Sequence, residues 1–256
     1  MWKAIRIAIL LFVLATVAQG AWLDRRDATD WANPLIVVLY PIAADDSEVT
    51  RRHLASLTLA QFEPMSLFLR EQARAHGLRI EQPLELKLAP RIESPPPAAP
   101  RDGYMAQIVW WSLKLRFWAW WNDTYQGAGA NVRLFLLFHD EQLTQRLAHS
   151  VGLEKGLVGV VNVFASESMA AENNVIIMHE MLHTLGATDK YDPATNMPRY
   201  PDGFAEIQRS PLLPQQFAEI MGGRIPITSV RAQQAEGLHQ VIIGELTARE
   251  INWKPR

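Results

Sequence analysis

Residues 179–189 read HEMLHTLGATD, and the interpretation of the whole fold depends on this stretch. If it begins as a helix, the four-residue step from His179 to His183 turns the chain by about 400° and advances it by about 6 Å. The two imidazoles then lie on one face and reach a common point. Neutral imidazole nitrogens bind Zn²⁺ at about 2.0–2.1 Å, and a catalytic zinc site takes three protein ligands and leaves one position for water. The spacing therefore predicts a zinc site on a helix.

The residues around the two histidines complete this predicted site. Glu180 follows the first histidine and is placed to take a proton from a water molecule at the metal. Gly186 can adopt the left-handed conformation that ends a helix, so the chain can turn back toward the metal. Asp189 then offers a carboxylate oxygen, which binds zinc at about 2.0–2.2 Å. We therefore predict His179, His183 and Asp189 as metal ligands and Glu180 as the catalytic base.

The third ligand has alternatives in the sequence. The chain contains no cysteine, so any metal must use histidine or carboxylate ligands. Asp192, Glu206 and Glu219 also follow the motif, and each could replace Asp189 as the ligand. Asp192 could instead accept a hydrogen bond from an imidazole N–H, which ligating histidines usually require. We favour Asp189 because Gly186 positions it. The remaining alternative is that the two histidines are ordinary polar groups on a helix.

The composition excludes nucleic acid as an expected partner. Lys and Arg number 25 against 27 Asp and Glu, which gives a formal net charge of -2, whereas a nucleic-acid-binding protein is expected to carry a basic surface. The chain is 48% hydrophobic and 20% charged, as is usual for globular proteins. Its 256 residues are enough for one domain with a full core. We expect one domain over residues 30–256.

The first residues indicate the compartment. Lys3 and Arg6 precede an apolar run at residues 7–18, and small residues follow it, which is the pattern of a secretory signal peptide. We therefore predict a signal peptide at residues 1–20 and export to the periplasm or the cell exterior. The alternative is an uncleaved membrane anchor, because the apolar stretch continued to Leu23 is near the lower limit for a membrane-spanning helix.

The order of apolar patterns predicts an α/β (α+β) fold with a mixed sheet. Unbroken or alternating apolar runs indicate strands, and a 3.6-residue period indicates helices. We expect strands at residues 35–40, 84–88, 132–138 and 157–164, and helices at residues 48–76, 104–121, 170–185 and 229–250. Pro41 is expected to close the first strand, and Pro64 to divide the first helix. The helix that carries the motif has a broad apolar surface, so we expect it to be buried and rigid.

Residues 104–121 are unusually rich in aromatic residues. The aromatic side chains are Tyr104, Trp110, Trp111, Phe117, Trp118, Trp120 and Trp121. We interpret this segment as a core helix. The alternatives are a surface helix whose tryptophans meet a membrane interface, which Lys114 and Arg116 would permit, and a helix that stacks on a ligand. The proline-rich residues 90–100 before it predict a linker or a stiff loop.

The extended motif HExxHxxGxxD resembles that of the metzincin clan of zinc endopeptidases, in the variant with Asp as the third ligand, as in the snapalysin-type proteases. Residues 219–223, EIMGG, resemble the turn with a methionine beneath the metal in that clan. The order of elements resembles the clan over residues 34–250, and individual motifs do so over residues 179–223. The resemblance implies a zincin-like domain with a mixed, twisted sheet, a buried zinc helix and a C-terminal helix. Residues 90–121 depart from this pattern.

The residues and the resemblance together predict an exported zinc-dependent endopeptidase acting on a peptide or protein. A zinc-bound water would attack the peptide carbonyl, with Glu180 as general base. Tyr191 or Tyr200 could supply a second donor to the oxyanion. The alternatives are a non-catalytic zinc-containing binding module, associated with a membrane through the N-terminal segment or the Trp-rich helix, and a zinc amidase acting on cell-wall peptides. Glu180 favours catalysis, because a structural zinc site needs no base. Neither cleavage specificity nor oligomeric state is predicted.

Overall fold

The structure is a computed structural model, and it describes residues 2, 5–7, 19–20, 23–100, 104–127, 129–154 and 156–255. Most of the apolar run on which the signal-peptide and anchor predictions depend, residues 8–18, lies outside the described residues. Within the described part of the chain, no helix has both the length and the apolar character needed to cross a membrane.

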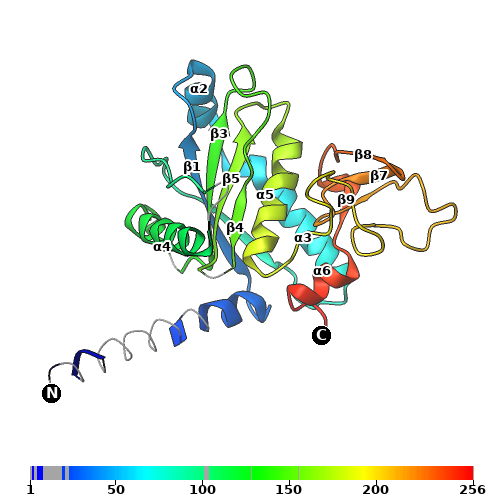
Figure 1. Cartoon of the computed structure of the whole chain (residues 1–256), viewed down its shortest axis with the longest axis horizontal. Helices are drawn as coiled ribbons and strands as arrows, with labels where there is room; N and C mark the ends of the chain where they lie inside the picture. Colours follow the sequence, from blue (N-terminus) through cyan, green and yellow to red (C-terminus); the bar gives the residue numbers. More distant parts are fainter. Residues whose placement is uncertain are drawn as a thin grey trace.

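A five-stranded mixed sheet lies at the centre of the structure, which confirms the predicted mixed α/β class (Figure 1). The strands are β1 (Leu35–Ala43), β2 (Leu84–Leu88), β3 (Val132–His139), β4 (Val151–Leu153) and β5 (Val158–Phe164). Their order across the sheet is β2-β1-β3-β5-β4. All neighbouring pairs are parallel except β4 and β5, which are antiparallel. Four of the strands coincide with predicted ones, and β4 is an edge strand that the sequence pattern did not indicate.

The first strand is longer than predicted, because Pro41 does not end it. The carbonyl oxygens of Leu39 and Pro41 accept hydrogen bonds from the N–H groups of Ala89 and Ile92. The nitrogen of Pro41 faces the same side as its carbonyl, and β2 has already ended at Leu88 on that side. Proline is tolerated there because no N–H is needed for the ladder.

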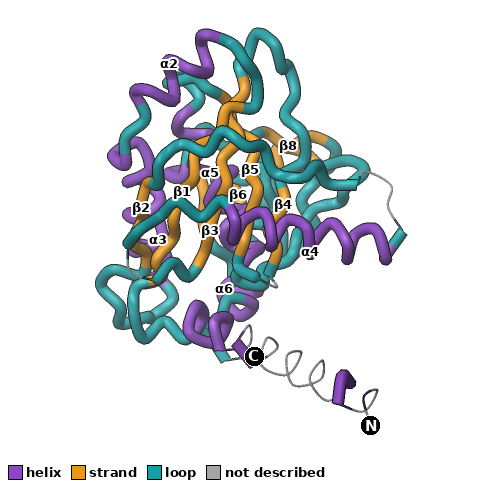
Figure 2. The backbone as a smooth tube through the Cα atoms, turned by 90° about the vertical axis from the view of Figure 1, so that its left-hand side faces the viewer, coloured by secondary structure: helices purple, strands orange, loops and turns teal. Residues whose placement is uncertain are grey.

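Helices cover both faces of the sheet (Figures 1 and 2). The alternation along β1 shows this directly, since Val37 and Leu39 pack with one set of helices and Val38 and Tyr40 with another. Helices α3 (Glu63–Ala75) and α5 (Ala170–Thr184) contribute to the first core, and α4 (Met105–Trp121) contributes to the second. Residues 48–76 are divided into separate helices, as predicted, but not at Pro64. The extended residues Leu57 and Thr58 separate α2 (Glu48–Ser56) from the short helix η1 (Leu59–Phe62), and Pro64 lies in the first turn of α3.

The interpretation of residues 104–121 as a core helix is wrong for most of its side chains. Trp111, Leu115 and Ala119 are buried against the sheet. Trp110 and Trp120, by contrast, are 61% and 70% exposed. The sequence does not distinguish the two sides of α4, because its apolar residues occupy the whole circumference of the helix.

The predicted C-terminal helix at residues 229–250 is also wrong over most of its length. The segment forms β8 (Arg231–Gln233), the short helix η2 (Leu238–Gln240), β9 (Val241–Ile242) and only then α6 (Glu245–Glu250). Strand β8 pairs with β7 (Ile225–Thr228), and β9 pairs with β6 (Ala218–Glu219). Gly237 and Gly244 lower the helical propensity of this segment, and the β-branched residues between them favour strand. The helix that does form has six residues.

The edge strand β4 packs closely on the helix that carries the motif. This contact predicts that position 152 must be glycine. A Cβ atom added to Gly152 would lie 2.6 Å from the carbonyl oxygen of Glu180 and 2.6 Å from Cβ of His183. We expect Gly152→Ala to lower the free energy of unfolding by about 1–3 kcal/mol, as overpacking usually does. Urea denaturation measures this change.

The matched control is Gly129→Ala, because a Cβ atom added there meets no atom within 4 Å. This variant should unfold within about 0.5 kcal/mol of the wild type, as surface substitutions usually do. Equal stability of the Gly152→Ala and wild-type proteins would contradict the close packing of β4 on α5.

Candidate metal centre

The motif lies on the last turn and a half of α5, and the helix ends as the sequence predicted. The N–H of Gly186 donates to the carbonyl of His183, and the N–H of Ala187 donates to the carbonyl of Leu182. Gly186 has a φ of 103°, in the left-handed region. This is the Schellman arrangement, in which glycine satisfies the last carbonyls of a helix and reverses the chain. The reversal directs Asp189 back toward the two histidines.

Three side-chain atoms converge beside the end of α5. Nε2 of His179 lies 3.1 Å from Nε2 of His183, and Oδ1 of Asp189 lies 3.2 Å and 3.1 Å from these two atoms, respectively. Nδ1 of His179 lies 2.8 Å from the carbonyl oxygen of Ile220. Nδ1 of His183 lies 2.8 Å from the carbonyl oxygen of Ala187. A carbonyl oxygen can only accept, so both Nδ1 atoms carry a proton, and in the neutral imidazoles both Nε2 atoms present lone pairs.

The three converging atoms fit a zinc ion. Four ligands at about 2.0–2.1 Å in a tetrahedral arrangement lie about 3.3 Å from one another, close to the separations of 3.1–3.2 Å found here. Burial opposes the ionisation of Asp189, but the two imidazoles beside it hold the pKa of its carboxyl well below the usual range. Burial lowers the pKa of His179, whereas Asp189 and Glu180 raise it above its ordinary value. The cluster is therefore built to hold a positive charge.

Two of the alternative ligands are turned away from this cluster. The carboxylate of Asp192 accepts hydrogen bonds from the N–H groups of Ala194 and Thr195. It also does not receive an imidazole N–H, because the backbone carbonyls described above take that role. The carboxylate of Glu206 is bonded to Arg209 and to the N–H of Gln216. Both residues stabilise the loop in which they lie.

The third alternative, Glu219, is fully buried and fully hydrogen-bonded. One carboxylate oxygen accepts from the N–H groups of Met221 and Gly222, and the other accepts from the N–H of Gly244 and the hydroxyl of Thr247. Burial raises the pKa of Glu219, and these donors act against that rise. The side chain therefore ties the turn at residues 219–223 to the start of α6, and Asp189 is the carboxylate that reaches the histidines.

Glu180 differs from the other acidic residues because it is buried without a full set of partners. Glu180 is 8% exposed, and its Oε2 atom has no hydrogen-bond partner. The ligand atoms of Glu180 and of both histidines lie within 4.8 Å of one another. Asp189 lies closer to the two histidines, at 3.1–3.2 Å. Burial raises the pKa of the Glu180 carboxyl. These features suit a proton acceptor beside the metal better than a ligand.

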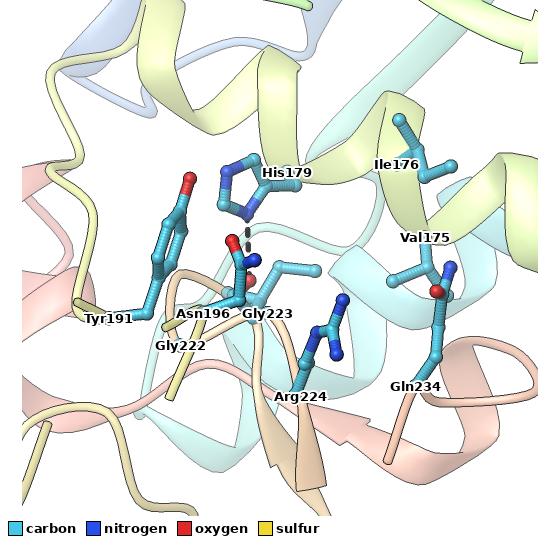
Figure 3. Close-up of a pocket in the computed structure, with 10 residues that line it drawn as sticks. Val175, Ile176, His179, Tyr191, Asn196, Gly222, Gly223, Arg224 and Gln234 are labelled. Atoms are coloured by element: carbon cyan, nitrogen blue, oxygen red, sulfur yellow. Dashed lines mark hydrogen bonds between the residues drawn. The ribbon is translucent and has the colours of Figure 1, made fainter. Parts of the chain in front are cut away.

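Of the two tyrosines considered as second donors, only Tyr191 lies at the cluster. Burial and the nearby charge of Asp189 raise the pKa of Tyr191 to about 12. Its ring centre lies 6.4 Å from that of His179 (Figure 3). Tyr200 is 59% exposed and packs edge-on against Phe204. Tyr191 therefore remains protonated and can donate a hydrogen bond at the cluster.

A cavity of about 180 Å³ opens beside His179. Its lining combines three apolar residues, the two glycines after Met221 and five polar side chains (Figure 3). These residues are Val175, Ile176, His179, Tyr191, Asn196, Ile220, Gly222, Gly223, Arg224 and Gln234. The polar residues Asn196, Arg224 and Gln234 belong to loops and a turn, where no sequence motif identifies them. Among the described residues, no acidic side chain forms an ion pair with Arg224.

No known protein-family model matches the sequence, and no curated protein matches it. The chemistry of the cluster therefore carries the functional argument.

The ligand assignment predicts how zinc binding responds to two neighbouring Asp→Ala changes. We expect Asp189→Ala to weaken zinc binding by more than about 100-fold, because removal of residues that only support ligands already costs about 10–100-fold. Asp192→Ala is the matched control and should leave zinc binding unchanged. Competition with a chromophoric chelator measures both affinities. Unchanged zinc affinity in Asp189→Ala would remove Asp189 from the ligand set.

Proposed function

We propose that this protein is a zinc-dependent hydrolase that cleaves peptide bonds, with His179, His183 and Asp189 as the metal ligands. The observation that carries the proposal is the convergence of three lone-pair atoms beside a buried carboxylate, Glu180, that lacks a partner. A zinc ion held there would lower the pKa of a water molecule and polarise a carbonyl group. Hydrolysis of an amide needs both of these effects.

The role proposed for Glu180 is to move a proton. A carboxyl whose pKa is raised by burial is a better proton acceptor than an exposed one, so Glu180 can accept a proton from the attacking water. The same residue can then pass that proton to the leaving amine. A structural metal site has no use for a buried, unpartnered carboxylate, so Glu180 supports catalysis over the alternative of a non-catalytic zinc-containing binding module.

Tyr191 and the cavity supply the remaining functions of a hydrolase site. The Tyr191 hydroxyl is a protonated donor at the cluster and is suited to hold the oxygen of a reacting carbonyl. The cavity beside His179 is lined by Val175, Ile176 and Ile220 on its apolar side. It is large enough for a side chain next to the bond that is cleaved, and we propose that it positions the substrate.

The proposed family is the metzincin clan, with Asp as the third ligand. Two observations support the resemblance: Gly186 ends the helix and returns the chain to the histidines, and the turn at residues 219–223 accepts the Nδ1–H of His179 through Ile220. Export is supported by the sequence of residues 1–20. An amidase acting on cell-wall peptides is the alternative within the same chemistry, and both substrates belong in the assay.

Replacement of the proposed base separates catalysis from metal binding. We expect Glu180→Gln to lower kcat by about 10²–10⁴-fold, because it removes general base catalysis, while zinc content stays at the wild-type level. Glu172→Gln is the matched control, since it makes the same change on α5 away from the cluster, and its activity should be unchanged. Cleavage of labelled peptides, with and without a chelator, measures the effect. An inactive wild-type protein with bound zinc would instead support the binding module.

The unpaired Arg224 predicts a substrate preference. A carboxylate on the substrate side chain that enters the cavity would form a charge-assisted hydrogen bond with Arg224, worth about 1.5–3 kcal/mol. We therefore expect Arg224→Ala to raise KM for peptides with an acidic residue at that position by about tenfold or more, and to change KM for neutral peptides little. Arg231→Ala, in the exposed strand β8, is the control. Equal effects on acidic and neutral peptides would exclude Arg224 from specificity.

A further inference from the structure

The outward side of α4 is a continuous apolar surface. It consists of Val109, Trp110, Leu113, Phe117, Trp120 and Trp121, whose exposed fractions lie between 49% and 72%. We call this set the outer face of α4. Monomeric soluble proteins rarely expose so many large apolar side chains together, and such a patch usually marks an interaction site.

The charged residues of α4 border the outer face. The helix contains two cations, Lys114 and Arg116, and no acidic residue. Lys114 precedes the buried Leu115 and Arg116 follows it, so the two cations project about 100° to either side of the buried side. Each cation therefore lies along a different edge of the outer face. Lys114 lies 5.5 Å from the centre of the Trp110 ring, and Arg116 donates to the hydroxyl of Ser112. An apolar face flanked by cations is the pattern of a helix that lies in a membrane interface.

The helical segment at residues 23–29 approaches the same place. Arg25, in the helical segment at residues 23–29, forms an ion pair with Glu154 at the turn between β4 and β5. A Cβ atom added to Gly156 in the same turn would lie 3.2 Å from Cδ of Arg116. One turn therefore contacts both α4 and the segment that follows the apolar residues 7–18 of the sequence. Figure 1 shows the segment at residues 23–29 and α4 on the same side of the molecule.

We propose that α4 binds the surface of an anionic lipid bilayer through its outer face. Trp110, Trp120 and Trp121 have the amphipathic rings that favour the headgroup region, and Lys114 and Arg116 complement acidic headgroups. The absence of any acidic residue from α4 favours an anionic surface over a second copy of the same helix, in which the cations would face one another. Because α4 and α5 cover opposite faces of the sheet, a bilayer on α4 leaves the metal centre open to substrate.

The test must separate α4 from residues 7–18. The full chain is therefore made with Leu11→Asp and Leu14→Asp, which remove the apolar character of that run, and this protein is the background for all variants. Flotation is measured with phosphatidylcholine vesicles and with vesicles that contain about one-third phosphatidylglycerol. We expect binding to the anionic vesicles, and quenching of tryptophan fluorescence by brominated lipids.

Two changes to α4 should weaken this binding. The double variant Trp110→Gln with Trp120→Gln should lower the partition coefficient by at least about tenfold, because it removes two aromatic rings that would be buried in the bilayer interface. Lys114→Glu should lower binding to the anionic vesicles and leave the weaker binding to phosphatidylcholine unchanged. The matched control is Leu143→Gln with Val230→Gln, which removes two exposed apolar residues elsewhere and should have no effect.

Three results would overturn the proposal. One is a background protein that does not float with anionic vesicles and shows no quenching by brominated lipids, a measurement that needs no change in α4. Another is equal binding by the tryptophan variants and the control. The third is a dimer in sedimentation experiments that becomes a monomer in Trp110→Gln with Trp120→Gln, without vesicle binding, which would make the outer face an interface between copies of the chain.

Discussion

Two hydrogen bonds to backbone carbonyls set the direction of both imidazoles, and one of them connects the motif to the C-terminal part of the chain. His183 finds its acceptor four residues away at Ala187, but His179 finds its acceptor 41 residues away at Ile220. One such bond contributes about 0.5–1.5 kcal/mol, which cannot alone fix a connection of that length. Packing has to supply the difference. Ile220 and Met221 are 1% and 0% exposed, so packing in the core holds the turn that carries the acceptor of His179.

Glu219 explains how a polar turn can be buried so deeply. A buried carboxylate is costly unless hydrogen bonds replace its water. Here four donors do so, two from the turn itself at Met221 and Gly222 and two from the start of α6 at Gly244 and Thr247. The same carboxylate therefore shapes the turn and fixes α6 against it. This arrangement explains why the C-terminal segment is folded around the turn as short strands instead of forming one long helix.

The sequence predicted the elements whose signals are local. Strands β1, β2, β3 and β5 followed from apolar runs, and the end of α5 followed from Gly186. Strand β4 has three residues and is stabilised by its pairing with β5 and its contact with α5, so no local pattern reveals it. The exposed side of α4 was missed because the helix is apolar all round and periodicity cannot tell which side is covered. Residues 229–250 were misread because their apolar spacing fits a helix, whereas Gly237, Gly244 and pairing with distant strands override it.

The comparison of two buried glutamates separates structure from function in this site. Glu219 and Glu180 both have a carboxyl pKa raised by burial, and sequence alone allowed either to lie near the metal. Each carboxylate oxygen of Glu219 accepts two hydrogen bonds. Glu180 contributes the only carboxylate oxygen, among the described residues, that is buried with no partner at all. Such an atom destabilises the folded state by about 1–3 kcal/mol. It lies beside three acceptor atoms that face one another at 3.1–3.2 Å, which is unfavourable for neutral imidazoles next to a carboxylate unless a cation lies between them. These two costs at one place support the proposal of a metal ion held by the histidines and Asp189, with Glu180 as a proton acceptor beside it.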